Sequence, residues 1–149
     1  MSTAQHRDGG CLCGAVRFSA TLEHTAYGIC HCKMCQRWAG GIFAAITVPK
    51  ANLAWQGSEH IARIQSSDWA ERGWCTQCGS GLFYRVTRNG PNDGEWEIPV
   101  GLFDNSDDLT LEREIFIDRK PNSYTICGHH QTLTEAEVIA LYGSTSEGA

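Results

Sequence analysis

The stretch Gly10-Cys11-Leu12-Cys13-Gly14-Ala15-Val16 places two cysteines one residue apart, directly before a segment with the alternating pattern of a half-buried strand. A second close pair lies far along the chain, in Cys75-Thr76-Gln77-Cys78-Gly79, which is typical of a zinc knuckle. Such spacings bring several sulfurs to one point, as a tetrahedral Zn²⁺ requires. We therefore expect the two pairs to form one closed site of four thiolates that fastens the N-terminal strand to a distant hairpin.

A third cluster, Cys30-His31-Cys32-Lys33-Met34-Cys35, supplies three more sulfurs. Seven clustered cysteines cannot fill two four-cysteine sites. A metal bound by the third cluster would therefore keep one open coordination position. Catalytic zinc sites have such an open position, whereas structural zinc sites are closed. An alternative is that both metals are structural and another side chain completes the second set. The candidates for that role are His31, His60, His129, His130 and Asp104. A disulfide framework is less favoured, because disulfide partners are usually distant in sequence.

The composition sets the class of protein. The chain has 149 residues, 42% of them hydrophobic, which is enough for the core of one domain. The net charge of -5 argues against nucleic acid or an anionic membrane as a partner. The polar N-terminus does not have the apolar stretch of a signal peptide, so we expect a cytoplasmic protein whose 8 cysteines remain reduced.

Short runs of alternating or β-branched residues, separated by turn residues, predict a mainly β domain with mostly antiparallel pairing. A short helix is expected at 36–39. A C-terminal helix is expected from the capping box Thr134-x-x-Glu137 to Gly143, with its apolar face formed by Val138, Leu141 and Tyr142. One domain should span residues 9–143, with flexible tails at 1–8 and 144–149. The expected strands are 10–20, 27–30, 41–48, 53–55, 60–65, 69–74, 82–86, 95–100 and 113–117.

The three cysteine motifs, in this order and spacing, resemble those of the glutathione-dependent formaldehyde-activating enzymes, also called the S-hydroxymethylglutathione synthase or centromere-protein-V type. The segments 98–104 (IPVGLFD) and 115–121 (IFIDRKP) are similar to that family as well, and the likeness runs from about Gly9 to Gly143. The resemblance implies a small zinc-stapled fold, the β-tent, and two Zn²⁺ per chain. It implies a structural zinc at Cys11, Cys13, Cys75 and Cys78, and a catalytic zinc at Cys30, Cys32 and Cys35.

The family's named activity joins glutathione to formaldehyde. Three thiolates make zinc a weak Lewis acid that suits a fourth thiolate, so its expected task is to lower the pKa of an incoming thiol beside an electrophile. The expected class is a carbon–sulfur lyase with a small-molecule thiol and aldehyde as partners. The alternative is a non-enzymatic, zinc-stabilised binding module.

Side chains around the triplet are further candidates. Lys33 and Arg37 could bind a glutathione carboxylate or could be solvated surface charges, and Arg119 and Lys120 are weaker candidates. His31 could donate a proton to the substrate or could be a bystander. The leftover Cys127 is expected to be a small buried hydrophobe.

Overall fold

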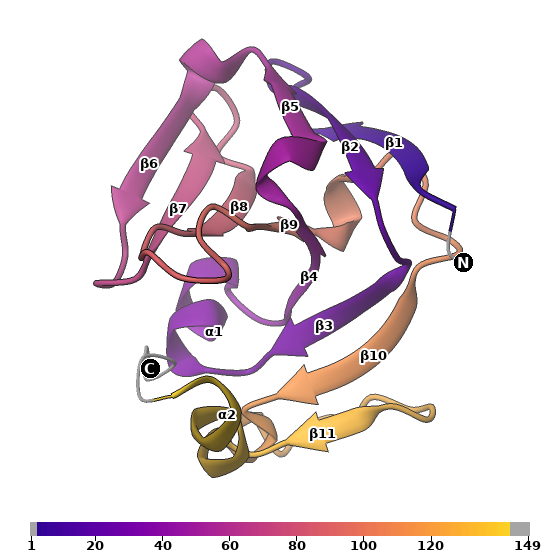
Figure 1. Cartoon of the computed structure of the whole chain (residues 1–149), viewed down its shortest axis with the longest axis vertical. Helices are drawn as coiled ribbons and strands as arrows, with labels where there is room; N and C mark the ends of the chain where they lie inside the picture. The colour runs from indigo at the N-terminus through magenta and orange to yellow at the C-terminus, as the bar shows by residue number, and fades with distance from the viewer. Residues whose placement is uncertain (1–2, 144–149) are drawn as a thin grey trace. The chain divides into compact units, whose positions relative to one another are not determined.

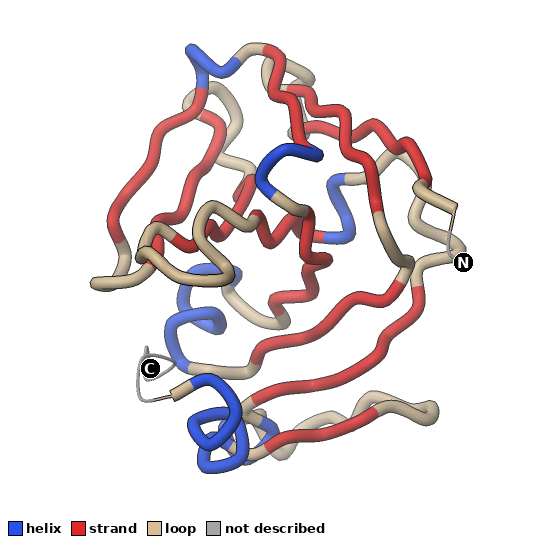
Figure 2. Tube along the Cα trace, in the orientation of Figure 1, coloured by secondary structure: helices blue, strands red, loops and turns tan. Residues whose placement is uncertain are grey.

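The structure is a computed structural model that describes residues 3–143. These residues contain eleven strands and two α-helices, which confirms the mainly β class (Figure 2). They form two compact units, one built from residues 3–25 and 45–109 and the other from residues 26–44 and 110–143. The predicted C-terminal tail at 144–149 lies outside the described residues.

The first unit contains two antiparallel sheets. The smaller sheet has the order β1-β2-β5, with β1 at Gln5–Gly10, β2 at Arg17–Leu22 and β5 at Leu53–Gln56 (Figure 1). The larger has the order β4-β9-β8-β7-β6, and every pairing in it is antiparallel. Its strands are β4 (Phe43–Val48), β6 (Ile61–Gln65), β7 (Ala70–Cys75), β8 (Gly81–Val86) and β9 (Trp96–Pro99).

The second unit is built differently, because its three strands run parallel. β10 (Thr110–Ile115) lies between β3 (Ala26–Cys30) and β11 (Gln131–Leu133). The mostly antiparallel pairing that the sequence predicts therefore holds for the first unit, and these three strands are the exception to it. Parallel neighbours need long connections, and the helix α1 (Lys33–Ala39) begins the connection that leaves β3.

The helix α2 (Glu135–Tyr142) has the predicted capping box: the Thr134 hydroxyl accepts from the Glu137 N–H, and the Glu137 carboxylate accepts from the Thr134 N–H. Its apolar face is narrower than predicted. Val138 is buried, whereas Leu141 and Tyr142 are exposed. Among residues 3–143, no helix combines the length and the apolar character needed to cross a bilayer.

The N-terminal strand is a further difference from the sequence prediction. Residues 5–8 fall in the segment expected to be a flexible tail, but each of them pairs with a residue of β2 between Ser19 and Leu22. Arg7 holds this strand by donating to the backbone carbonyl of Asn105 and to the carboxylate of Asp108. Backbone pairing and the contacts of the half-buried Arg7 thus hold this strand, although its sequence does not show apolar alternation.

The core of the first unit is a cluster of aromatic rings. The Phe83 and Trp96 ring centroids lie 4.8 Å apart, and the Trp55 ring lies 5.7 Å from each of them. Phe18 continues the cluster through edge contacts with Trp55 and Phe103. The rings fix the sheet that carries Cys75 at the end of β7.

Gly73 lies opposite Phe83 in the β7–β8 pair, and we predict that Gly73→Ala destabilises the protein. A Cβ atom at Gly73 would lie 2.4 Å from two atoms of the Phe83 ring, which is fully buried among its aromatic neighbours. We expect the free energy of unfolding in urea to fall by about 1–3 kcal/mol. The matched control is Gly101→Ala, where a Cβ meets no atom within 4 Å among the described residues. Equal stability of the two variants would refute the packing argument.

Candidate metal centres

Four cysteine sulfurs meet in the first unit, all within 4.8 Å of one another. Cys11 and Cys13 lie in the turn after β1, Cys75 ends β7, and Cys78 lies in the turn before β8. The Cys13 sulfur lies 3.6 Å from that of Cys11 and 3.9 Å from that of Cys75. Sulfurs bound to one tetrahedral Zn²⁺ lie roughly 3.8 Å apart, given Zn–S bonds near 2.3 Å. The four positions therefore fit a metal of this kind.

Both turns follow the same local pattern. Gly14 and Gly79 each have a positive φ, of 80° and 77°, and each donates its N–H to the carbonyl of the first cysteine in its turn. The backbone N–H groups of Val16 and Gln77 donate to the sulfurs of Cys11 and Cys75. Such hydrogen bonds stabilise thiolates, and thiolates are the ligand form of cysteine.

The acidity of the thiols also fits a site built for a cation. Hydrogen bonds from the Ser80 hydroxyl and backbone lower the pKa of Cys78 to about 5. Although a backbone hydrogen bond from Ala15 lowers the pKa of Cys13, desolvation and the neighbouring thiols raise it to about 11. These neighbouring thiols therefore have opposite pKa shifts, because one negative sulfur opposes the ionisation of the next.

Three further sulfurs meet in the second unit, also within 4.8 Å of one another. Cys30 ends β3, Cys32 is the N-cap of α1, and Cys35 lies in the first turn of that helix. The Cys32 sulfur accepts a hydrogen bond from the Cys35 N–H. Cys32 and Cys35 are buried, and Cys30 is partly exposed. Contacts with the thiols of Cys32 and Cys35, followed by burial, raise the pKa of Cys30 well above its ordinary value.

The triplet differs from the first cluster in its number of ligands. Within the described residues of the second unit, no other histidine, cysteine or carboxylate joins the three sulfurs as a possible ligand. All eight cysteines are free thiols. Three soft donors at this spacing fit a zinc-type metal and leave one of its four coordination positions without a ligand from this unit.

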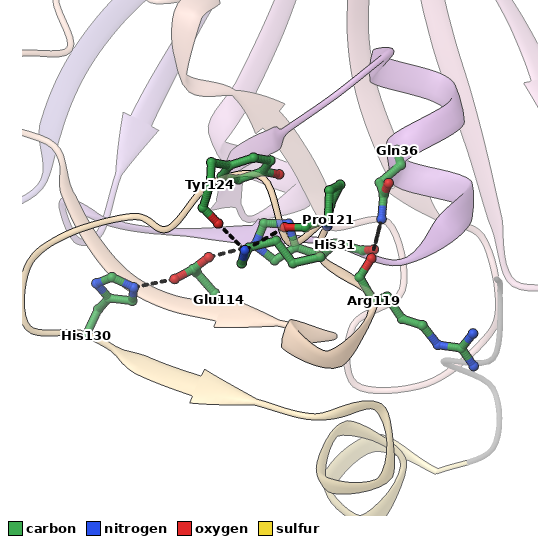
Figure 3. Close-up of polar contacts among 8 residues, drawn as sticks. His31, Gln36, Glu114, Arg119, Pro121, Tyr124 and His130 are labelled. Carbon is green, nitrogen blue, oxygen red and sulfur yellow. Dashed lines mark hydrogen bonds and ion pairs between the residues drawn. The ribbon is translucent and has the colours of Figure 1, made fainter.

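His31, between two cysteines of the triplet, is fully buried (Figure 3). Its Nε2 lies 2.6 Å from one oxygen of Glu114 on β10, and the other oxygen lies 2.5 Å from Nε2 of His130. His130 lies in the loop before β11, and its side chain is only 5% exposed. Sequence reasoning missed Glu114, because a glutamate in a strand normally marks the solvent face.

The other predicted residues lie as follows. Lys33 and Arg37 are exposed on α1; Lys33 lies within the triplet segment and Arg37 follows it. Arg119 is paired with Glu135, and the Lys120 ammonium donates to the carbonyls of Pro121 and Tyr124, so both are already engaged. In the first unit Asp104 forms a two-pronged ion pair with Arg17. Cys127 is exposed, so its expected burial is wrong.

Comparison with known proteins gives a consistent result. The profile of the family described as glutathione-dependent formaldehyde-activating enzyme matches residues 6–119. The chain belongs to this family. A protein of Schizosaccharomyces pombe named as an uncharacterized lyase is 30% identical over 132 residues, covering 89% of this chain and 93% of its own length. A Halomonas elongata protein, named as a putative glutathione-dependent formaldehyde-activating enzyme, is 29% identical over 128 residues. The match covers 77% of this chain and 77% of that protein.

The family match covers both cysteine clusters and all of β10. Membership supports an enzyme, in agreement with the resemblance seen in the cysteine motifs.

Proposed function

We propose that the protein is a zinc-dependent carbon–sulfur lyase that acts on a glutathione adduct such as S-hydroxymethylglutathione. The observation that carries the proposal is the unequal number of sulfurs in the two clusters, four in one and three in the other. A four-thiolate site is closed and suits a structural zinc, whereas a three-thiolate site has room for a fourth sulfur. Family membership supports the same assignment of substrate class.

The proposed reaction is the reversible addition of a thiol to formaldehyde. The thiol sulfur forms a bond to the carbonyl carbon, and the thiol proton ends on the carbonyl oxygen, which gives the hydroxymethyl thioether. In the lyase direction the C–S bond breaks and the proton returns to sulfur. A zinc ion held by three thiolates supplies a position for the substrate sulfur and lowers the pKa of its thiol.

The chain's own residues have separate tasks in this proposal. Cys30, Cys32 and Cys35 hold the metal, and the partial exposure of Cys30 gives solvent access to the cluster. Glutathione carries two carboxylates, so cations are needed near the triplet in a chain with a net charge of -5. Lys33 and Arg37 are the exposed cations nearest to it in sequence, and we assign them to carboxylate binding.

The proposal predicts that the zinc-loaded protein accelerates exchange between formaldehyde and S-hydroxymethylglutathione. ¹³C exchange NMR on labelled formaldehyde and glutathione measures that rate directly. We expect at least about a tenfold gain over buffer, equivalent to a barrier lowered by about 1.4 kcal/mol. The uncatalysed addition is already fast, so the required gain is small.

A matched reaction with 2-mercaptoethanol, which has no carboxylates, controls for the proposed role of Lys33 and Arg37. Acceleration should be larger with glutathione than with this thiol. An exchange rate equal to that in buffer at every protein concentration would contradict the proposal and favour a zinc-stabilised binding module.

A further inference from the structure

The buried carboxylate of Glu114 lies between two histidines of the second unit, in a line that runs from His31 to His130 (Figure 3). All three side chains are at most 5% exposed. A carboxylate accepts hydrogen bonds, so each imidazole donates to it from Nε2. Each oxygen of Glu114 therefore accepts one hydrogen bond, and the same carboxylate orients the rings of His31 and His130.

The electrostatic state of this group follows from its contacts. Burial raises the pKa of Glu114, and the hydrogen bonds from His130 and His31 lower it, with a net result below its ordinary value. Glu114 therefore remains an ionised acceptor. A buried charge is costly without partners, and here two donors supply them.

His31 is held at its backbone as well as at its ring. Its N–H donates to the carbonyl of Ile115 at 3.0 Å, and its carbonyl accepts from the Gln36 side chain at 2.6 Å. The same Gln36 amide also donates to the carbonyl of Arg119. The residue between two cysteines of the triplet is thus fixed at three points, and β10 supplies two of them.

The parallel register explains why Glu114 can reach this position. In the β10–β3 pair, Glu114 is matched with Ile29, and Ile115 is matched with Cys30. The carboxylate consequently lies at the end of β3, where the chain leaves the sheet and turns through His31 into α1. The Nδ1 atom of the His31 ring remains buried without a partner among the described residues. Leaving a buried nitrogen unpaired costs stability, which argues against a purely packing role for this ring.

We propose that Glu114 is a positioning residue of the triplet, which fixes His31 and thereby holds Cys30 and Cys32 at metal-binding distance, with His130 as its outer support. This inference rests on the proposed function, because it needs a metal at the triplet. Groups that orient the immediate surroundings of a metal commonly change its affinity when they are mutated. Glu114 would change the metal affinity through His31, which lies between two metal ligands but is not a ligand itself.

The test is Glu114→Gln, which keeps the shape of the side chain. Its amide oxygen can accept from one histidine, but its N–H faces the other histidine, whose Nε2 can then accept only if that ring changes tautomer. We expect the zinc affinity of the triplet to fall about 10- to 100-fold in competition with a chromophoric chelator, while the four-thiolate site is unchanged. The Co²⁺-loaded triplet should also show shifted d–d and thiolate-to-metal bands, a signature that a loss of global stability alone does not produce.

The matched control is Glu112→Gln, since Glu112 lies on the same strand but is exposed. It should leave zinc affinity and the cobalt spectrum as in the wild type. His130→Gln retains an amide donor toward Glu114, so this variant should keep most of the zinc affinity of the triplet. His130→Ala removes the donor, and we expect the zinc affinity of the triplet to fall about three- to tenfold.

The outcomes separate this inference from the function on which it rests. A wild-type triplet that binds no zinc would overturn the proposed function and this inference together. A wild-type triplet that binds zinc, with Glu114→Gln within twofold of its affinity and with the same cobalt spectrum, would overturn the positioning role alone. If Glu114→Gln does not fold, the zinc affinity and the cobalt spectrum of His130→Ala are measured in its place. Values equal to those of the wild type would then overturn the positioning role.

Discussion

The Cys32→Ser variant is expected to bind one zinc ion in place of two and to exchange formaldehyde no faster than buffer does. Cys32 is one of only three sulfurs at the triplet, so its loss leaves two, too few to hold zinc tightly. The variant should nevertheless fold. The Cys32 sulfur caps α1 by accepting from the Cys35 N–H, and a serine hydroxyl is among the best groups for that position.

The matched control for this prediction is Cys127→Ser, because Cys127 is exposed and lies outside both clusters. It should retain two zinc ions and the full exchange rate. Circular dichroism verifies the fold of both variants, and ¹³C exchange NMR measures their rates. A folded Cys32→Ser protein that accelerates exchange as well as the wild type would remove the triplet from the reaction.

The Cys75→Ser variant is expected to lose the fold of the first unit. Cys75 is completely buried at the end of β7, and its sulfur joins the turn after β1 to the turn before β8. Structural zinc sites contribute apparent binding energies of about 10–16 kcal/mol, which is comparable to the entire stability of about 5–15 kcal/mol of a domain. The expected loss is therefore several kcal/mol, enough to unfold the unit at 37 °C.

Amide hydrogen exchange measures this effect locally. Protection should disappear from β7 and β8 in Cys75→Ser and persist there in Cys32→Ser. Both substitutions replace a cysteine by a serine. A difference in amide protection between the two variants therefore shows that the two clusters have different roles. A Cys75→Ser protein with wild-type protection and a melting temperature within 3 °C, roughly the effect of 1 kcal/mol or less, would show that the first cluster is not structural.

Local signals in the sequence predicted much of this molecule. The strand at Trp96–Pro99 and the cap at Thr134 follow from alternation and from a capping box, which depend on neighbouring residues. β1 was missed because Gln5–Gly10 is polar and is held by backbone pairing with β2. The parallel pairing of β10 with two strands was missed because it depends on distant segments of the chain.

In the candidate site, too, local sequence signals predicted some features, whereas features that depend on distant segments were missed. The cysteine spacings predicted both clusters, since ligands one or two residues apart must lie together. Glu114 could not be found in this way. It lies 83 residues from His31, and only the register of β10 against β3 shows that a glutamate at this position is buried. The exposure of Cys127 likewise depends on a loop whose course no local pattern sets.

The central claim is that the odd cluster of three cysteines holds its own metal. Native mass spectrometry of the protein, purified under reducing conditions with zinc present, counts the ions bound to each folded chain. We expect two zinc ions per chain. A single zinc ion, retained in Cys32→Ser and lost in Cys75→Ser, would show that the triplet holds no metal and would contradict the proposed function.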